Sequence, residues 1–509
     1  MTAAATTVHA LIEQQARQRP HAVYARATET ERHLSYGDLA IGCRRVAAVL
    51  QGHGMQPGDT VSVVMPNGLQ TLRLLLGAMH GGFCVNPVNL LSQPEQMHYV
   101  LSHSDCRVAC VAPEWEAHVR GIVETFDRPV KLVVVDPDGD ALPGEEEPAS
   151  NAPPPPADAV ALLMYTSGTT GNPKGVMLTQ RNLAANAHAI SAEHRLQPSD
   201  RVLAVLPLYH INAFAVTMLA PLAHGGSLAM PPKFSAGRFW EQAAQTQCSW
   251  INVVPTMISY LLEGTRPPLA QTLAIRFCRS ASAALPPEHH RAFEQMFGIG
   301  IVETMGLTET AAPSFSNPMD PAARKLGSVG RASGCMAGVV DAKLAAVPDG
   351  VTGELVIRGP NVMLGYYKNE EATRASFTPD GWLRTGDLGH RDEDGFFFVT
   401  GRIKELIIKG GENIAPREID EALLRHPAVL EAAAVGVPDR HYGQEIGVCI
   451  VLREGCACTE DELREFGASV LGRYKTPGHY RFVRDLPRGP SGKVQRLKLL
   501  PLFAAVPLA

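Results

Sequence analysis

Short apolar runs rich in β-branched residues alternate with helical patterns through the first four hundred residues, and this alternation constrains the fold more than any other feature. Residues 60–65, 131–136 and 202–206 are runs of this kind, and residues 39–50 place apolar side chains at helical spacing. Strands that alternate with helices are typical of parallel sheets covered by helices. We therefore predict an α/β fold with mostly parallel sheets in a large N-terminal domain.

This pattern is interrupted once within the large domain. Residues 137–158 contain a Pro-Asp-Gly turn, three consecutive glutamates and four consecutive prolines. Such a composition is too polar to form a core. We predict a subdomain break in this segment.

A second change of pattern follows residue 401. Pro416 begins a helical pattern, and Thr459 with Glu462 three residues later forms the capping box that starts another helix. A small α+β unit with its own core accounts for this pattern. The expected division is a large domain over residues 1–400, a hinge at 401–404 and a small mobile domain over 405–509.

Composition excludes several classes of protein. The 509 residues carry 46 Lys and Arg against 51 Asp and Glu, and this balance lacks the basic field that nucleic-acid binding requires. No apolar run approaches the roughly 20 residues of a membrane span, and the N-terminus lacks the pattern of an export signal. The ten cysteines are scattered, as in a reduced cytoplasmic protein. We expect a cytoplasmic protein with no membrane span.

The strongest local motif runs from Tyr165 to Gly175, with the sequence YTSGTTGNPKG. Its glycines allow the backbone to curl, its hydroxyl groups converge, and Lys174 supplies a positive charge, a combination suited to a polyphosphate. It differs from a Walker A loop, in which glycine precedes the lysine and serine or threonine follows it. We expect this loop to bind phosphates and to precede a helix capped by Thr179.

The Tyr165–Gly175 motif resembles the signature of the adenylate-forming superfamily, which includes the acyl-CoA synthetases. Further matches follow in the same order along nearly the whole chain. They are Leu206–His210, Thr304–Glu309, Gly353–Leu355, Gly381–Asp387, Gly401–Glu405 and Pro490–Lys493. The resemblance implies an AMP-forming acyl-CoA synthetase, an acid-thiol ligase that uses ATP, Mg²⁺ and coenzyme A.

The resemblance also implies the residues of the nucleotide site. Glu309 matches the residue that holds Mg²⁺, Thr308 matches a contact to the α-phosphate, and Asp387 matches the carboxylate that accepts both ribose hydroxyls. The full set expected to bind ATP or AMP is Thr166, Ser167, Gly168, Thr169, Thr170, Lys174, Ser282, Thr304, Met305, Gly306, Thr308, Asp387 and Arg402.

A movement of the small domain would let one site perform two reactions. By resemblance Lys493 assists adenylation, with Lys404 as the hinge about which the domain swings. Gly410 and Gly411 would then leave room for the pantetheine arm of coenzyme A. His210 would gate the path between the acyl pocket and the thiol, and we list it with Lys493 and Glu309 among the catalytic residues.

Some residues depart from the usual pattern of the superfamily. Met305 stands where most members have a tyrosine that packs on adenine, so we expect softer stacking. The segment Arg279–Leu285 resembles the branch that includes oxalate-CoA ligases. We predict an acyl pocket formed by His210, Asn212, Arg279 and Ala281. The resemblance to the oxalate-CoA ligase branch implies a small acid as substrate, with a dianion such as oxalate, malonate or sulfoacetate as one possibility.

Three other functions stay open at this point. Phe214, Trp250 and Met257 could line a tunnel for a medium-chain, long-chain or aromatic acid, although core packing is the commoner role of such residues. The enzyme could load a separate carrier protein, or the chain could be an inactive binder of acyl-nucleotides. A small-molecule acid, ATP and coenzyme A are the expected partners, without nucleic acid, and a homodimer is left open.

Overall fold

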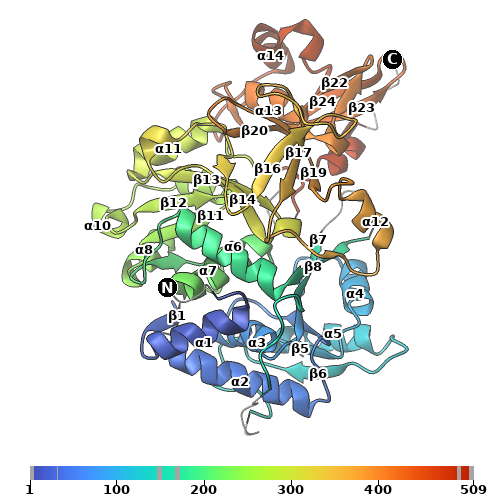
Figure 1. The fold of residues 1–509 in the computed structure, drawn as a ribbon. Helices are drawn as coiled ribbons and strands as arrows, with labels where there is room; N and C mark the ends of the chain where they lie inside the picture. Colours follow the sequence, from blue (N-terminus) through green and yellow to red (C-terminus); the bar gives the residue numbers. More distant parts are fainter. Residues whose placement is uncertain (1–4, 31, 146–151, 167–171, 490–493, 504–509) are drawn as a thin grey trace.

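Two large sheets, built mainly from parallel strands, organise the first four hundred residues (Figure 1). The structure is a computed structural model that describes residues 5–30, 32–145, 152–166, 172–489 and 494–503. The seven-stranded sheet has the order β18 (Gly365–Tyr366), β8 (Lys174–Thr179), β7 (Val160–Thr166), β4 (Cys84–Pro87), β3 (Thr60–Val64), β5 (Val108–Val111) and β6 (Lys131–Val134). Its strands from β7 to β6 are parallel.

The nine-stranded sheet carries most of the residues discussed below. Its order is β15 (Arg331–Ala332), β14 (Ala312–Ser316), β13 (Ile301–Leu307), β12 (Phe277–Ser280), β11 (Trp250–Val253), β9 (Arg201–Leu203), β10 (Ser227–Met230), β1 (Val23–Ala27) and β2 (His33–Ser35). The strands from β13 to β1 are parallel. The predicted α/β class with mostly parallel sheets is therefore confirmed.

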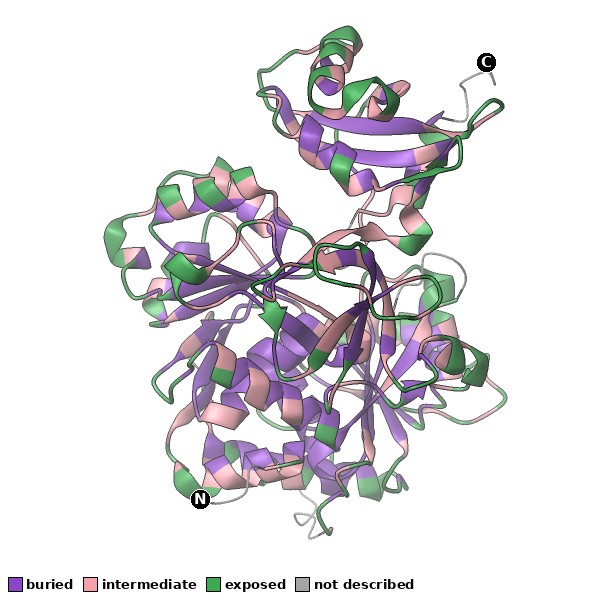
Figure 2. Ribbon diagram, turned by 45° about the horizontal axis from the view of Figure 1, so that its top comes forward, coloured by how far each residue is buried: buried purple, intermediate pink, exposed green. Residues whose placement is uncertain are grey.

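One hydrophobic core joins the two sheets. Its cluster includes Val61 of β3 and Leu228 of β10, and the helix α3 (Leu69–His80) between them is buried along its whole length. The neighbouring helices are α1 (Val8–Gln18), α2 (Tyr36–Gly52), α6 (Gln180–Glu193), α7 (Ala220–His224) and the π-helix η2 (Asn212–Leu219). Figure 2 shows the buried residues concentrated in the strands and on the inner helix faces.

Shorter elements complete the large region. The remaining α-helices there are α4 (Pro94–His103), α5 (Glu116–Val123), α8 (Phe239–Gln245), α9 (Pro255–Glu263), α10 (Leu269–Thr272), α11 (Pro287–Phe297) and α12 (Glu370–Ala375). The segment 137–158 connects β6 to β7, two strands of the same sheet. Hence the polar stretch links strands of one layer.

A four-stranded antiparallel sheet follows the two large ones. It consists of β16 (Met336–Val340), β17 (Gly353–Arg358), β19 (Leu383–Arg391) and β20 (Phe397–Arg402). In Figure 1 it lies between the large sheets and the last hundred residues. Its own apolar cluster includes Phe315 and Phe397, so it packs on the edge of the nine-stranded sheet.

The last hundred residues form a fourth group with a separate core. The sheet contains β21 (Ile407–Lys409), β22 (Glu412–Ile414), β23 (Val429–Asp439), β24 (Gly443–Leu452) and β25 (His479–Phe482), and the helices are α13 (Pro416–Leu423), α14 (Glu460–Lys475) and η6 (Arg496–Phe503). Pro416 stands in the first turn of α13, and Thr459 caps α14 with Glu462 as predicted. The apolar clusters of this group contain no residue before Ile407.

Two further predictions concern membrane spans and cysteines. Within the described ranges no helix is long and apolar enough to cross a membrane. All ten cysteines are described and none is in a disulfide.

Candidate active site

A cavity of about 300 Å³ lies between the large sheets and the small C-terminal group, and its size is that of a small-molecule site. Six residues that the sequence predicts for nucleotide binding line it together: Ser282, Thr304, Met305, Gly306, Asp387 and Arg402. From the small domain, Arg417 and Val494 line the opposite wall. Val494 follows Lys493, which lies outside the described residues.

The end of β13 forms part of the cavity wall, and the residues directly after it form a tight turn. The single turn η3 (Thr308–Thr310) comes directly after the strand and holds Thr308 and Glu309. The next two residues, Ala311 and Ala312, have φ values of 54° and 86°, which side-chain-bearing residues rarely adopt. A Cβ on Gly306 would lie 1.9 Å from the Ala312 carbonyl oxygen. Only glycine fits there, so this turn is tightly determined.

Side chains from α6 and its surroundings hold that turn in place. The Asn186 amide donates to the carbonyl oxygens of Thr310, Ala311 and Pro313 at 2.8–3.2 Å, and Asn361 donates to the Thr310 oxygen. These contacts satisfy backbone oxygens that the strained residues leave outside the sheet. The position of Glu309 is therefore fixed by the surrounding helix and loops.

Lys174, Tyr366 and Glu309 lie in a row beside this turn. The Lys174 ammonium lies 4.6 Å from the Tyr366 ring centroid, and the Tyr366 hydroxyl donates to Glu309 Oε1 at 2.8 Å. Lys174 and Tyr366 lie on neighbouring strands, because β18 pairs with β8. Tyr366 is a site residue that the sequence analysis missed, since no motif marks it.

The glycine-rich motif forms the connection between β7 and β8. Thr166 pairs with Lys174 across the two strands. Ser167, Gly168, Thr169 and Thr170 lie outside the described residues. Thr179 caps α6 as predicted, with Asn182 completing the capping box, but the strand β8 stands between the motif and the helix.

Asp387 and Arg402 face each other on neighbouring strands. Asp387 Oδ1 accepts from Arg402 Nε at 2.7 Å, and the Asp387 side chain is only 3% exposed. Burial would lower the pKa of Arg402, but the attraction of Asp387 and Glu405 outweighs it and raises that pKa. Arg402 therefore stays charged beside the carboxylate.

Glu354, from the Gly353–Leu355 motif, supports the Asp387 turn. One of its oxygens accepts two hydrogen bonds from Arg384, and the other accepts from the Gly386 N–H at 3.0 Å. The motif gives no role for this carboxylate, and the structure supplies one. It orients the segment that presents Asp387 to the cavity.

Arg279 is a buried cation that has no acidic partner within the described part of the chain. It is 1% exposed, and its Nη1 donates to the amide oxygens of Asn212 at 2.7 Å and Asn252 at 2.8 Å. Its Nε is buried with no acceptor among the described residues. Burial lowers the pKa of Arg279 to about 9, so it is cationic at neutral pH.

Two of the four predicted acyl-pocket residues, Asn212 and Arg279, belong to one hydrogen-bond network. Asn212 Nδ2 donates at 3.2 Å to the hydroxyl of Ser282, which lines the cavity with φ of 74°. Ala281, beside Arg279, is buried. Asn252 completes the network and was missed, although a single asparagine inside the apolar run 250–254 is the signal that could have found it.

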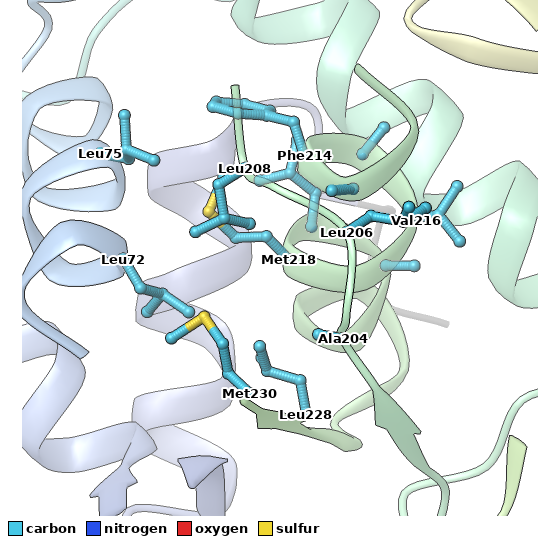
Figure 3. Packing of buried hydrophobic residues seen from close by; sticks show 14 of the residues in the cluster. Leu72, Leu75, Ala204, Leu206, Leu208, Phe214, Val216, Met218, Leu228 and Met230 are labelled. Carbon is cyan, nitrogen blue, oxygen red and sulfur yellow. The ribbon is translucent and has the colours of Figure 1, made fainter. Parts of the chain in front are cut away.

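His210 and the residues suggested for an apolar tunnel lie near the π-helix. His210 is half-buried in the turn before η2, and its backbone N–H donates to Pro207. Phe214 and Trp250 are fully buried in the main core, and Figure 3 shows Phe214 among Leu75, Leu206 and Leu208. Both side chains pack in the core of this structure, and Met257, the third residue suggested for a tunnel, is half-buried against it.

The junction with the small domain contains Lys404 and the diglycine turn. Lys404 is exposed in the single turn η5 (Ile403–Glu405), which begins directly after β20 ends at Arg402. Gly410 and Gly411 connect β21 and β22 with φ of 56° and 87°, as a two-residue hairpin requires. The geometry of this turn therefore accounts for both glycines, in addition to the role with coenzyme A expected from the sequence.

Two groups of described residues could hold a metal ion. Glu309 accepts one hydrogen bond, from Tyr366, so the carboxylate keeps capacity for a hard cation that bound phosphates would share. His9, Glu13 and His80 form a second cluster far along the chain from the cavity. There Glu13 already accepts from His80 and is paired with Arg44.

Comparison with known proteins gives the same assignment along the whole chain. The model of the AMP-binding enzymes matches residues 12–367, and the model of their C-terminal domain matches residues 418–493. A sulfoacetate–CoA ligase from Cupriavidus necator is 57% identical, with 97% of each chain covered. An oxalate–CoA ligase from Arabidopsis thaliana is 34% identical, with 89% of this chain and 90% of the relative covered. The crystal structure of ATP-bound MatB from Rhodopseudomonas palustris superposes with a TM-score of 0.92 at 30% identity, covering 98% and 99% of the two chains.

Proposed function

Since this chain belongs to the family of AMP-binding enzymes, we propose that it is an AMP-forming ligase that joins a small dianionic acid to coenzyme A. Sulfoacetate is the first candidate, because the sulfoacetate–CoA ligase from Cupriavidus necator is 57% identical to this chain over nearly the full length. The oxalate–CoA ligase among the relatives acts on another short dianion.

The observation that carries the choice of substrate is the buried charge of Arg279. A buried guanidinium surrounded only by neutral amide oxygens is costly unless an anion joins it. The carboxylate that reacts must lie near the nucleotide, so a second anionic group on the acid would pair with Arg279. A monocarboxylate would leave that cation without an anion.

The reaction itself has two steps. A carboxylate oxygen of the acid attacks the α-phosphorus of ATP, the bond to the β-phosphate oxygen breaks, and acyl-AMP and pyrophosphate form. The sulfur of coenzyme A then attacks the acyl carbonyl, AMP leaves with its phosphate, and the thiol proton passes to solvent. Both steps build charge on oxygen atoms, which oriented donors and cations stabilise.

We assign the nucleotide to the cavity between the domains. Met305 and Gly306 would cover the adenine, Asp387 would accept the ribose hydroxyls with Arg402 beside it, and Ser282, Thr304 and Thr308 would contact the remaining polar groups. Lys174 and the Thr166–Thr170 loop would bind the phosphates. Glu309 would hold Mg²⁺, which supplies charge neutralisation to the departing pyrophosphate.

The acyl and thiol ends of the site follow from the same proposal. His210 and Ala281 would border the acid next to Arg279 and Asn212, and Lys493 would bridge the carboxylate and the α-phosphate during adenylation. A rotation about Lys404, with the hinge at residues 401–404, would bring Gly410 and Gly411 to the pantetheine. The separate apolar core after residue 407 supports such a movement.

Pyrophosphate release tests the function directly. Purified protein with Mg-ATP would be supplied with oxalate, malonate, sulfoacetate, acetate, benzoate, decanoate or palmitate, each with and without coenzyme A. We expect coenzyme A-dependent turnover with a maximum on a short dianion. A maximum on decanoate or palmitate would overturn the substrate class. Release that ignores coenzyme A would favour a carrier protein as acceptor, and no release with any acid would favour an inactive binder.

A further inference from the structure

The side chains that accept hydrogen bonds from Arg279 are uncharged amides. Asn252 lies on β11 directly opposite Arg279 on β12, and Asn212 begins the π-helix η2. Aspartate has the same shape as asparagine, so either position could have carried a carboxylate and formed a buried ion pair. The chain instead surrounds the guanidinium with two amides.

The hydrogen bonds fix which amide atoms face the guanidinium. The Asn212 oxygen accepts from Arg279 and from Asn252 Nδ2 at 3.3 Å, while its own Nδ2 donates to Ser282. The Asn252 oxygen accepts from Arg279 at 2.8 Å. Reversing either amide would place an N–H against the guanidinium, so the network specifies one arrangement.

This arrangement leaves one nitrogen of Arg279 for a ligand. Nη1 of Arg279 donates to both asparagines, and Nε is fully buried without an acceptor. Nη2 also has no acceptor in the described chain, but unlike Nε it is not fully buried. Ser282, at the end of the same network, lines the cavity. Arg279, Asn212 and Asn252 do not line that cavity themselves, so an anion would have to enter beyond Ser282 to meet Nη2.

We propose that Asn212 and Asn252 are specificity-determining positioning residues, which hold Arg279 without neutralising it so that the substrate's second anionic group supplies the missing negative charge. This inference rests on the proposed function. Discrimination then comes from an unpaired buried cation when a monoanion binds, a stronger penalty than a missing apolar contact.

The test compares two acids that share one shape. Sulfoacetate carries a sulfonate and a carboxylate, whereas methylsulfonylacetate replaces one sulfonate oxygen with a methyl group and has a single charge. The measured quantity is the ratio of kcat/KM for the two acids in pyrophosphate release with coenzyme A. We expect the natural protein to favour sulfoacetate by about 100-fold or more, as expected when a buried charge loses its partner.

The variant Asn252→Asp places a negative charge of the protein itself next to Arg279. The expected result is a ratio that falls by about 100-fold, because the new carboxylate pairs with Arg279 and repels the sulfonate. Its melting temperature without substrate should rise, since the buried cation gains a partner. Asn212→Asp is the second variant and should change the ratio in the same direction.

Asn252→Ala is the matched control. It removes the amide without adding a charge, so kcat/KM should fall for both acids and the ratio should stay within about threefold of the natural value. If Asn252→Asp and Asn212→Asp, folded by their melting curves, keep the natural ratio, the inference is wrong while the ligase assignment stands. If the natural protein uses neither acid, the proposed substrate class itself fails.

Discussion

Glu303, the residue before Thr304, is a buried carboxyl at the cavity wall. Its Oε2 lies 3.9 Å from His290 Nδ1, and Arg417 and Glu421 of α13 act on it from the small domain. Burial raises the pKa of Glu303 to about 7, and the opposing attraction of Arg417 is smaller. The folded protein therefore keeps this carboxyl protonated over a range in which the unfolded chain ionises it.

The sign of the resulting pH dependence follows. The stabilising effect of the protonated carboxyl is fully present below about pH 4.5 and is lost as pH rises to about 7, by roughly 3 kcal/mol. Glu303→Gln should remove this loss, so its melting temperature should fall less than that of the natural protein between pH 5 and pH 7.5. Parallel melting profiles for the two proteins would show that Glu303 is already ionised at pH 5.

Met305 provides a second test at the residue scale. It is half-buried on β13 and lines the cavity opposite residues of the small domain. An aromatic ring stacks on adenine better than a thioether does, so Met305→Tyr should keep kcat and lower the KM for ATP several-fold. Met305→Leu is the control and should leave KM near its natural value. A folded but inactive Met305→Tyr would mean that the adenine lies elsewhere.

The sequence singles out residues where a motif carries them. Asp387, Arg402 and Met305 belong to such motifs, and all three line one cavity. Asn252 and Tyr366 belong to none, because their roles depend on a neighbour far away in the sequence, Arg279 for one and Glu309 for the other. A contact of this kind becomes visible only when strand order is known.

At the scale of elements, the pairing of β8 with β18 brings Tyr366 to Glu309. Tyr366→Phe keeps the ring beneath Lys174 and removes the hydroxyl that orients the carboxylate. Loss of such a supporting hydrogen bond should raise the Mg²⁺ concentration for half-maximal activity about tenfold and weaken Mg-ATP binding measured by calorimetry. Tyr367→Phe is the matched control, since the Tyr367 hydroxyl donates to Asp105 instead. Identical behaviour of the two variants would remove Tyr366 from the nucleotide site.

The same region contains a strand, β8, that the sequence pattern did not predict. The motif predicts a loop that precedes a helix capped by Thr179. The structure adds a strand between them, Lys174–Thr179, in which Val176 and Leu178 are buried and Met177 is half-buried. A six-residue segment that is buried on both faces is too short to distinguish a strand from a loop by pattern alone. Thr179 still begins the helix as predicted, because its capping contacts are local.

At the scale of the whole molecule, the cavity depends on how the small domain sits against the large one. Arg417 Nη1 donates to the Val399 carbonyl oxygen at 2.7 Å, and Arg496 contacts both Glu405 and Asp420 near the junction. The change of pattern after residue 401 predicts a separate unit. It cannot predict this contact, which depends on orientation. The antiparallel sheet of β16, β17, β19 and β20 was likewise not predicted, although it carries Asp387.

Lys493 tests the proposed movement of the small domain. If this lysine acts only in adenylation, Lys493→Ala should lower acyl-adenylate formation by at least about 100-fold. The same variant should still convert a chemically supplied acyl-adenylate to the thioester at a rate near the natural one. Pyrophosphate release reports the first step and thioester formation reports the second. Equal loss of both would contradict a site that alternates between two domain orientations.

The central claim is that this ligase selects a short dianion through the charge of Arg279. The most direct measurement is the mass of the thioester formed from Mg-ATP, coenzyme A and an equimolar mixture of sulfoacetate, methylsulfonylacetate and decanoate. We expect sulfoacetyl-CoA to dominate the products, and Arg279→Gln to lose that preference. A natural protein that forms mainly the methylsulfonylacetyl or decanoyl thioester would contradict the claim.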